Sequence, residues 1–117
     1  MDSDRLTSIT ASELAGLIAA GDVSPVDVVE AYLERIDRYN AKLNAFITVT
    51  RDQAIRAARD AEQAVARGDG LGPLHGLPLA VKDQFETKDV LTTAGSRVLS
   101  DYVPDHDSVV VERLRDA

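Results

Sequence analysis

The 117-residue chain contains no cysteine and no tryptophan, and its aromatic side chains are limited to three tyrosines and two phenylalanines. Without cysteine, disulfides and cysteine-ligated metal sites are excluded. With so few rings, the core must consist mainly of aliphatic side chains and alanine. The first residues, Met1 to Arg5, are polar, and no apolar run follows them, so we expect neither a signal peptide nor a membrane-spanning segment. These absences fit a cytoplasmic protein.

Basic side chains are also scarce. Thirteen Lys and Arg residues face 20 Asp and Glu residues, which gives a net charge of -7. A protein that binds the phosphate backbone needs a basic face, so we expect no direct binding of nucleic acid and no association with a membrane. The hydrophobic fraction of 44% and the charged fraction of 28% are ordinary for one soluble globular domain, or part of one.

The first 70 residues carry strong helix signals. Thr10 and Glu13 have the spacing of a capping box, and Gly21 supplies a stop. A second helix is predicted to begin with Ser24 as its N-cap and Pro25 at its first position, and to end near Asn40.

A third helix follows a short β-prone run at residues 45–49. Thr50 and Gln53 again have capping-box spacing, and Gly68 marks the end of the helix. Between them the segment is rich in alanine, so we expect it to pack closely on its neighbours. A solvated spacer helix is the alternative, because the segment also carries many surface charges.

From residue 68 the composition changes. A loop rich in glycine and proline leads into two β-like runs at residues 77–81 and 90–93, and a turn at Gly95 follows. A last helix is predicted to start at Asp107 or Ser108 and to continue through Leu114. Helices followed by strands and a further helix favour an α/β layered domain.

The glycine-rich loop is not a phosphate-binding motif. It lacks the Gly-Lys-Ser/Thr of a P-loop, and His75 stands where the dinucleotide fingerprint needs glycine. His75 and His106 are the only histidines, and we interpret the sequence from Asp105 to Asp107 as a turn before a helix, because adjacent residues rarely converge on one ion. We therefore expect no cofactor and no metal.

Lys82 is the most informative single residue. It ends an apolar run, Gly-Leu-Pro-Leu-Ala-Val, and Asp83 follows it directly. A lysine in apolar surroundings must find a counter-ion or lose its charge, and a neutral lysine can act as a base. The alternative is a lysine that is solvated or paired, as most lysines at the end of a strand are.

Several segments together resemble the amidase signature family. Residues 76–83 resemble the family's catalytic-lysine segment, and Thr-Thr-Ala-Gly-Ser at residues 92–96 matches a further part at the expected spacing. Residues 107–114 resemble the helix that follows, while Ser24-Pro25 and residues 43–46 resemble the family's N-terminal helices. The resemblance runs from about Leu6 to the end of the chain. One departure is Asp89, where the family usually has glycine; aspartate tolerates left-handed turn geometry, so we expect the turn to survive.

This resemblance implies an α/β fold: the N-terminal portion of the amidase signature fold, with a helical layer packed on the first strands of a mixed β-sheet. Residues 1–70 would form the helical layer, and residues 71–117 the first strands and the following helix of a single amidase domain. The last helix has no glycine, asparagine or proline exit, so we expect the domain to continue beyond Ala117.

The resemblance also implies a Ser-Ser-Lys amide hydrolase acting on the carbon–nitrogen bonds of linear amides, with Lys82 as the catalytic lysine. The nucleophilic and bridging serines are expected outside this chain, since Ser96 and Ser100 do not match their positions. We therefore expect the chain to be inactive alone. If Lys82 has to be neutral, the adjacent carboxylate of Asp83 should point away from it. The implied partner is a small-molecule amide substrate, and a homodimer of the full-length enzyme is possible.

Two alternatives stay open. The A subunit of an aminoacyl-tRNA amidotransferase resembles amidases over the same region. The chain could also be a non-enzymatic interaction module derived from an amidase, for which its helices and acidic surface would be suitable.

Overall fold

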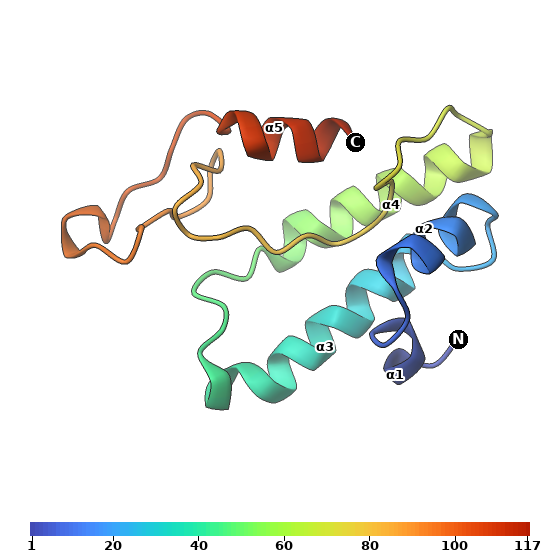
Figure 1. Cartoon of the computed structure of the whole chain (residues 1–117), viewed down its shortest axis with the longest axis horizontal. Coiled ribbons are helices and arrows are strands. Elements are labelled where there is room, and N and C mark those ends of the chain that lie inside the picture. Colours follow the sequence, from blue (N-terminus) through green and yellow to red (C-terminus); the bar gives the residue numbers. More distant parts are fainter. The chain divides into compact units, whose positions relative to one another are not determined.

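The structure is a computed structural model that describes all residues, 1–117. It contains five α-helices and one short 3-10 helix, and no strand (Figure 1). The elements are α1 (Ser3–Leu6), α2 (Ala11–Ala19), α3 (Pro25–Leu43), α4 (Arg51–Arg67), η1 (Arg97–Leu99) and α5 (Val109–Asp116). No helix combines the length and the apolar character needed to cross a membrane.

The chain forms two compact units. The helical unit comprises Met1–Phe46 and Thr50–Pro78, and therefore holds α1 to α4. The loop unit comprises Ile47–Val49 and Leu79–Ala117, and holds η1 and α5.

The helix starts predicted for α2 and α3 are confirmed. The hydroxyl of Thr10 accepts the backbone N–H of Glu13 at 3.2 Å, which caps α2. The hydroxyl of Ser24 accepts the N–H of Val26 at 3.0 Å, and Pro25 occupies the first turn of α3. Both caps satisfy backbone donors that a helix start otherwise leaves free.

The end of α3 and the start of α4 differ from the prediction. Helix α3 runs on to Leu43, and Asn44 ends it in the left-handed conformation, with φ 49°. Asn40 is not the terminus, and its side-chain amide instead exchanges two hydrogen bonds with the backbone of Phe46. Thr50 precedes α4 but its hydroxyl caps nothing, because its ψ of 55° lies outside the extended region that a capping residue uses.

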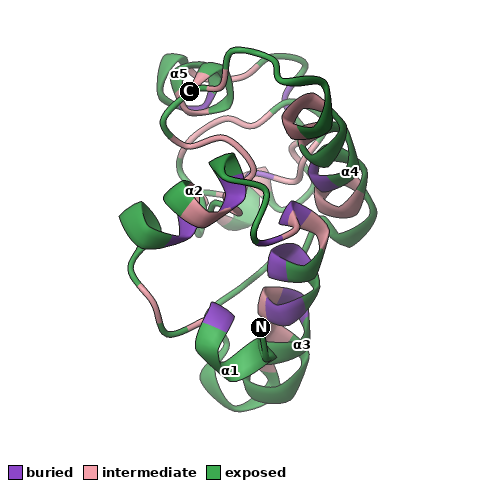
Figure 2. Ribbon diagram, turned by 90° about the vertical axis from the view of Figure 1, so that its right-hand side faces the viewer, coloured by how far each residue is buried: buried purple, intermediate pink, exposed green.

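The core of the helical unit lies between amphipathic helices. Helices α3 and α4 run antiparallel to each other (Figure 1). Ala58 of α4 is buried with Val29 and Leu33 of α3, which confirms the close packing expected of the alanine-rich helix. A second cluster of buried aliphatic side chains comes mainly from α1, α2 and α3, and their buried faces are visible in Figure 2: Leu6, Leu14, Ile18, Val23, Val28 and Ala31.

The predicted mixed β-sheet is wrong. Residues 77–81 and 90–93, and the β-prone run at residues 45–49, are extended or irregular and form no ladder. The loop unit has only isolated backbone bonds of this kind, such as Thr92 N–H to the carbonyl of Tyr102 at 2.9 Å and Asp89 N–H to that of Pro104 at 2.9 Å. An apolar, β-prone run becomes a strand only where a neighbour pairs with it, and none does so here. The α/β fold class is therefore corrected to a helical one.

The turn at Asp89 behaves as predicted. Asp89 has φ 59°, in the left-handed region that glycine usually occupies. Its own N–H is held by the carbonyl of Pro104, so the turn forms without glycine.

Candidate active site

Lys82 lies in the loop unit with an exposed side chain. The apolar residues before it are also open, since Leu79 and Val81 are 48% and 39% exposed. The carbonyl of Lys82 accepts the N–H of Phe85 at 3.0 Å, so a tight turn follows the lysine. Its amine takes part in no ion pair with another residue of the chain.

Asp83 does not pair with Lys82. Its carboxylate accepts the backbone N–H of Thr93 at 2.8 Å through one oxygen and the hydroxyl of Thr93 through the other. The Thr93 hydroxyl, and after it the Thr93 N–H, hold the pKa of Asp83 below its usual range, while partial burial opposes them. Both carboxylate oxygens of Asp83 are therefore bonded to Thr93, and Asp83 forms no ion pair with Lys82.

A left-handed turn follows Thr93. Ala94 and Gly95 have φ 49° and 68°, and the Gly95 N–H donates to the Thr93 hydroxyl oxygen at 3.1 Å. The next residue, Ser96, caps η1 by accepting the N–H of Val98 at 3.2 Å. Ser96 is therefore the N-cap of η1, and Ser100 is the C-cap of the same short helix.

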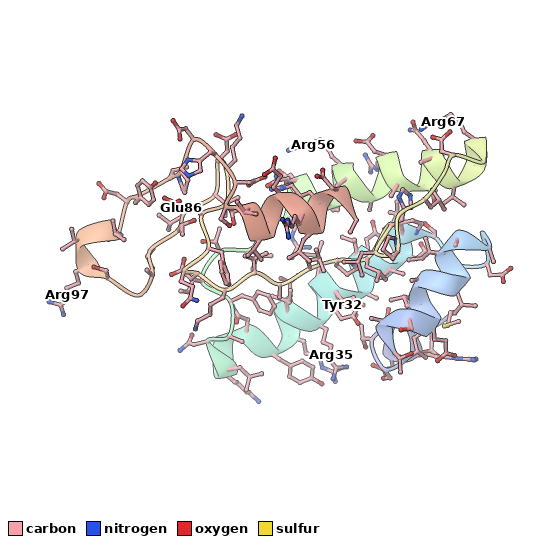
Figure 3. All side chains as sticks on the ribbon, turned by 45° about the horizontal axis from the view of Figure 1, so that its top comes forward. Tyr32, Arg35, Arg56, Arg67, Glu86 and Arg97 are labelled. Carbon is pink, nitrogen blue, oxygen red and sulfur yellow. The ribbon has the colours of Figure 1, made fainter.

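Sequence reasoning missed a polar cluster in the loop unit, the Glu86 cluster, formed by Glu86, Tyr102, Asp105 and His106. Glu86 accepts the Tyr102 hydroxyl at 2.6 Å, and its other oxygen lies 3.0 Å from Nε2 of His106. Nδ1 of His106 lies 2.9 Å from the carboxylate of Asp105. Figure 3 labels Glu86 on its loop. No local motif could have indicated the cluster, because Glu86 and His106 are twenty positions apart.

Hydrogen bonds, and after them charges, shift the pKa values of all four titratable groups in the Glu86 cluster. The hydrogen bond to Asp105, followed by the charge of Glu86, raises the pKa of His106. The Tyr102 hydroxyl lowers the pKa of Glu86, and Glu86 in turn raises the pKa of Tyr102. The hydrogen bond from His106 lowers the pKa of Asp105. The cluster favours a protonated His106 between two carboxylates.

The remaining polar residues singled out in the sequence have structural contacts. Nε2 of His75, in the helical unit, lies 3.0 Å from the carbonyl of Ala61. Asp107 accepts the Lys88 N–H at 2.7 Å and pairs with Arg115 at 2.8 Å. Ser108, rather than Asp107, is the N-cap residue of α5, although its hydroxyl makes no capping bond. No group of three or more His, Asp or Glu side chains could hold a metal ion.

Comparisons with known proteins point to one family. A family profile described as Amidase matches residues 27–117. The chain is 50% identical over 112 residues to the A subunit of the glutamyl-tRNA(Gln) amidotransferase of Salinispora tropica, and 44% identical over 113 residues to that of Thermobifida fusca. These matches cover 96% and 97% of the chain but 23% of each relative, so the chain spans about a quarter of their length.

Solved structures agree with the sequence relatives. A fatty acid amide hydrolase superimposes with a TM-score of 0.89 at 29% identity, over 97% of this chain and 20% of its own. A protein of a vestigial complex, studied for the evolutionary origins of an s-triazine catabolic enzyme, superimposes with a TM-score of 0.88 at 36% identity. That match covers 92% of this chain and 24% of the other.

Proposed function

Because the chain belongs to the amidase family, we propose that it is the N-terminal part of a single amidase domain and supplies Lys82 as the catalytic lysine of an amide hydrolase. The proposed substrate is a small molecule with a linear amide. The observation that carries the proposal is that Lys82 has no partner in the chain while the carboxylate beside it is bound elsewhere.

The arrangement suits a lysine that works as a base. A base has to give up its proton before it can take one, and a carboxylate in contact would hold that proton in place. Asp83 directs both of its oxygens to Thr93, so this competing ion pair is not formed. An exposed amine on a short turn is also able to reach groups supplied by the rest of a longer protein.

The proposed chemistry is that of the Ser-Ser-Lys arrangement. Neutral Lys82 takes a proton from a bridging serine, which takes one from the nucleophilic serine as its oxygen attacks the amide carbon. The carbon–nitrogen bond breaks, the leaving amine receives the proton, and water then hydrolyses the acyl-serine ester. Both serines are proposed to belong to the part of the protein beyond this chain, because the relatives are about four times longer. The 117 residues alone are accordingly proposed to be inactive.

The test is amide hydrolysis by the full-length gene product that carries this chain. Ammonia or amine release is measured with a panel of aliphatic and aryl amides and glutamine. Lys82→Ala should lower kcat by about 10²–10⁴-fold, the usual contribution of a positioned acid or base. Lys88→Ala is the matched control, because it removes another exposed lysine of the loop unit. Full activity of Lys82→Ala would overturn the proposal.

A second candidate function has specific support. The relatives at 50% and 44% identity are named as the A subunit of a glutamyl-tRNA(Gln) amidotransferase. In that case the nitrogen released from an amide donor would pass to a charged tRNA, and Lys82 would keep the same role. The two functions are separated by supplying glutamine with or without glutamyl-tRNA(Gln) and the remaining components of the amidotransferase. Formation of amidated tRNA that depends on Lys82 would favour the amidotransferase.

A further inference from the structure

Three hydrogen bonds join Asp83 to Thr93 and the residue after it. Two of the bonds run from the N–H and the hydroxyl of Thr93 to the two carboxylate oxygens of Asp83. A third runs from the N–H of Ala94 to the backbone carbonyl of Asp83 at 2.8 Å. We call these three bonds the Asp83–Thr93 clasp. It ties the residue after the lysine to a segment ten positions further along.

On the Thr93 side, the clasp leads into a strained turn at Ala94 and Gly95. Ala94 has φ 49°, a left-handed conformation that is unfavourable for a residue with a Cβ atom. The turn persists because the Thr93 hydroxyl oxygen accepts the Gly95 N–H while the hydroxyl donates to Asp83. Strain held in place by several bonds is typical of functional segments.

On the Asp83 side, the clasp adjoins the turn that follows Lys82. The Lys82 carbonyl accepts the Phe85 N–H at 3.0 Å, and Asp83 lies inside this turn. The backbone around the lysine is therefore fixed from two directions, by its own turn and by the clasp. The side chain of Lys82 is exposed and forms no ion pair in the chain.

We propose that Asp83 and Thr93 are positioning residues for Lys82: the clasp fixes the backbone from which the amine projects, and occupies the carboxylate that would otherwise pair with it. This inference rests on the proposed function of Lys82. The lowered pKa of Asp83 agrees with it, because the Thr93 hydroxyl is the first cause of that shift and the charge of Lys82 is the last.

The experiment uses the full-length gene product and three variants. Thr93→Val keeps the shape of the side chain but removes the hydroxyl that bonds Asp83. Thr93→Ser restores the hydroxyl. Thr87→Val is the matched control, because Thr87 is half-buried in the same unit and its hydroxyl bonds only a carbonyl two residues away.

Two measurements are made on each variant. The first is kcat and KM for amide hydrolysis. The second is independent of catalysis: an amine-reactive reagent is applied briefly, and labelling of Lys82 relative to Lys88 is counted by peptide mass spectrometry. A carboxylate released from Thr93 can approach the lysine, so Lys82 should become less reactive by about two- to fivefold, the range of an exposed ion pair.

We expect Thr93→Val to lower kcat by about 10- to 100-fold, as a misplaced catalytic group does, with KM within about twofold. Thr93→Ser should recover most of the rate, and Thr87→Val should match the wild type in both measurements. A loss of kcat with no change in the labelling ratio would overturn the inference, since the loss would then be general to the fold. A changed ratio with unchanged kcat would overturn it as well.

Failure of the proposed function gives a different pattern. If Lys82→Ala keeps full activity, Lys82 is not catalytic, and no positioning of it can matter to the rate. If Lys82→Ala is inactive while Thr93→Val equals Thr87→Val in both measurements, the function stands and the positioning role is wrong.

Discussion

Substitution of Gly76 by alanine should destabilise the helical unit for two separate reasons. Gly76 has φ 75°, in the left-handed region. A Cβ atom built there would lie 3.1 Å from Cγ2 of Ile18 and 3.1 Å from Cγ of Pro25. Both neighbours are among the most completely buried side chains, so neither can move aside freely.

The two effects can be given magnitudes. A left-handed conformation costs an alanine about 1–2 kcal/mol. Forcing a methyl group into a packed core adds typically about 1–3 kcal/mol. Gly76→Ala should therefore lower the free energy of unfolding by about 2–5 kcal/mol. For a chain of this length, each kcal/mol corresponds to about 4 °C in Tm.

Urea unfolding followed by circular dichroism measures this loss. Gly68→Ala is the matched control, because Gly68 has nearly the same φ, 73°, and no atom lies within 4 Å of the place that an added methyl group would take. The control should lose only the backbone contribution, about 1–2 kcal/mol. Equal shifts of the urea midpoint in the two variants would refute the packing half of the reasoning.

Further predictions concern caps and pH. Ser24→Ala should cost about 1–2 kcal/mol in urea unfolding, because it removes the cap of α3 and the bond to Glu62, whereas Thr50→Ala should cost little because its hydroxyl caps nothing. The pKa of His106 is raised in the folded chain, so its stabilising contribution is complete below its unfolded pKa of about 6.5 and disappears as pH rises through the folded value. His106→Gln should therefore lower the urea midpoint more at pH 6 than at pH 8. Equal losses at the two pH values would contradict the assigned contacts.

The helices were predictable because their signals are local. Ser24 and Pro25 begin α3 as expected, and Gly68 ends α4 with φ 73°. Each depends on a few adjacent residues and on backbone geometry that the residue type favours. The predicted cap at Thr50 shows the limit of such local signals. The residue type permits a cap, but the backbone there has ψ 55° and the hydroxyl makes no capping bond.

The strands were not predictable in the same way. Residues 77–81 have the composition of a strand. Composition indicates only that a segment is able to pair with a neighbouring strand. Pairing is a property of two segments, and the sequence of one does not reveal whether the other lies beside it. The Glu86 cluster was missed for a similar reason, because its members come together only through the path of the loop.

Lys82 could be singled out even though the strand prediction around it was wrong, because its proposed chemistry does not depend on a β-ladder. A lysine in the proposed role of a base needs a fixed backbone and no competing carboxylate. The Asp83–Thr93 clasp gives both through bonds between side chains and turns, with residues 77–81 unpaired. Residues 76–83 and residues 92–96, which carry the resemblance to the family, are in direct contact through Asp83 and Thr93.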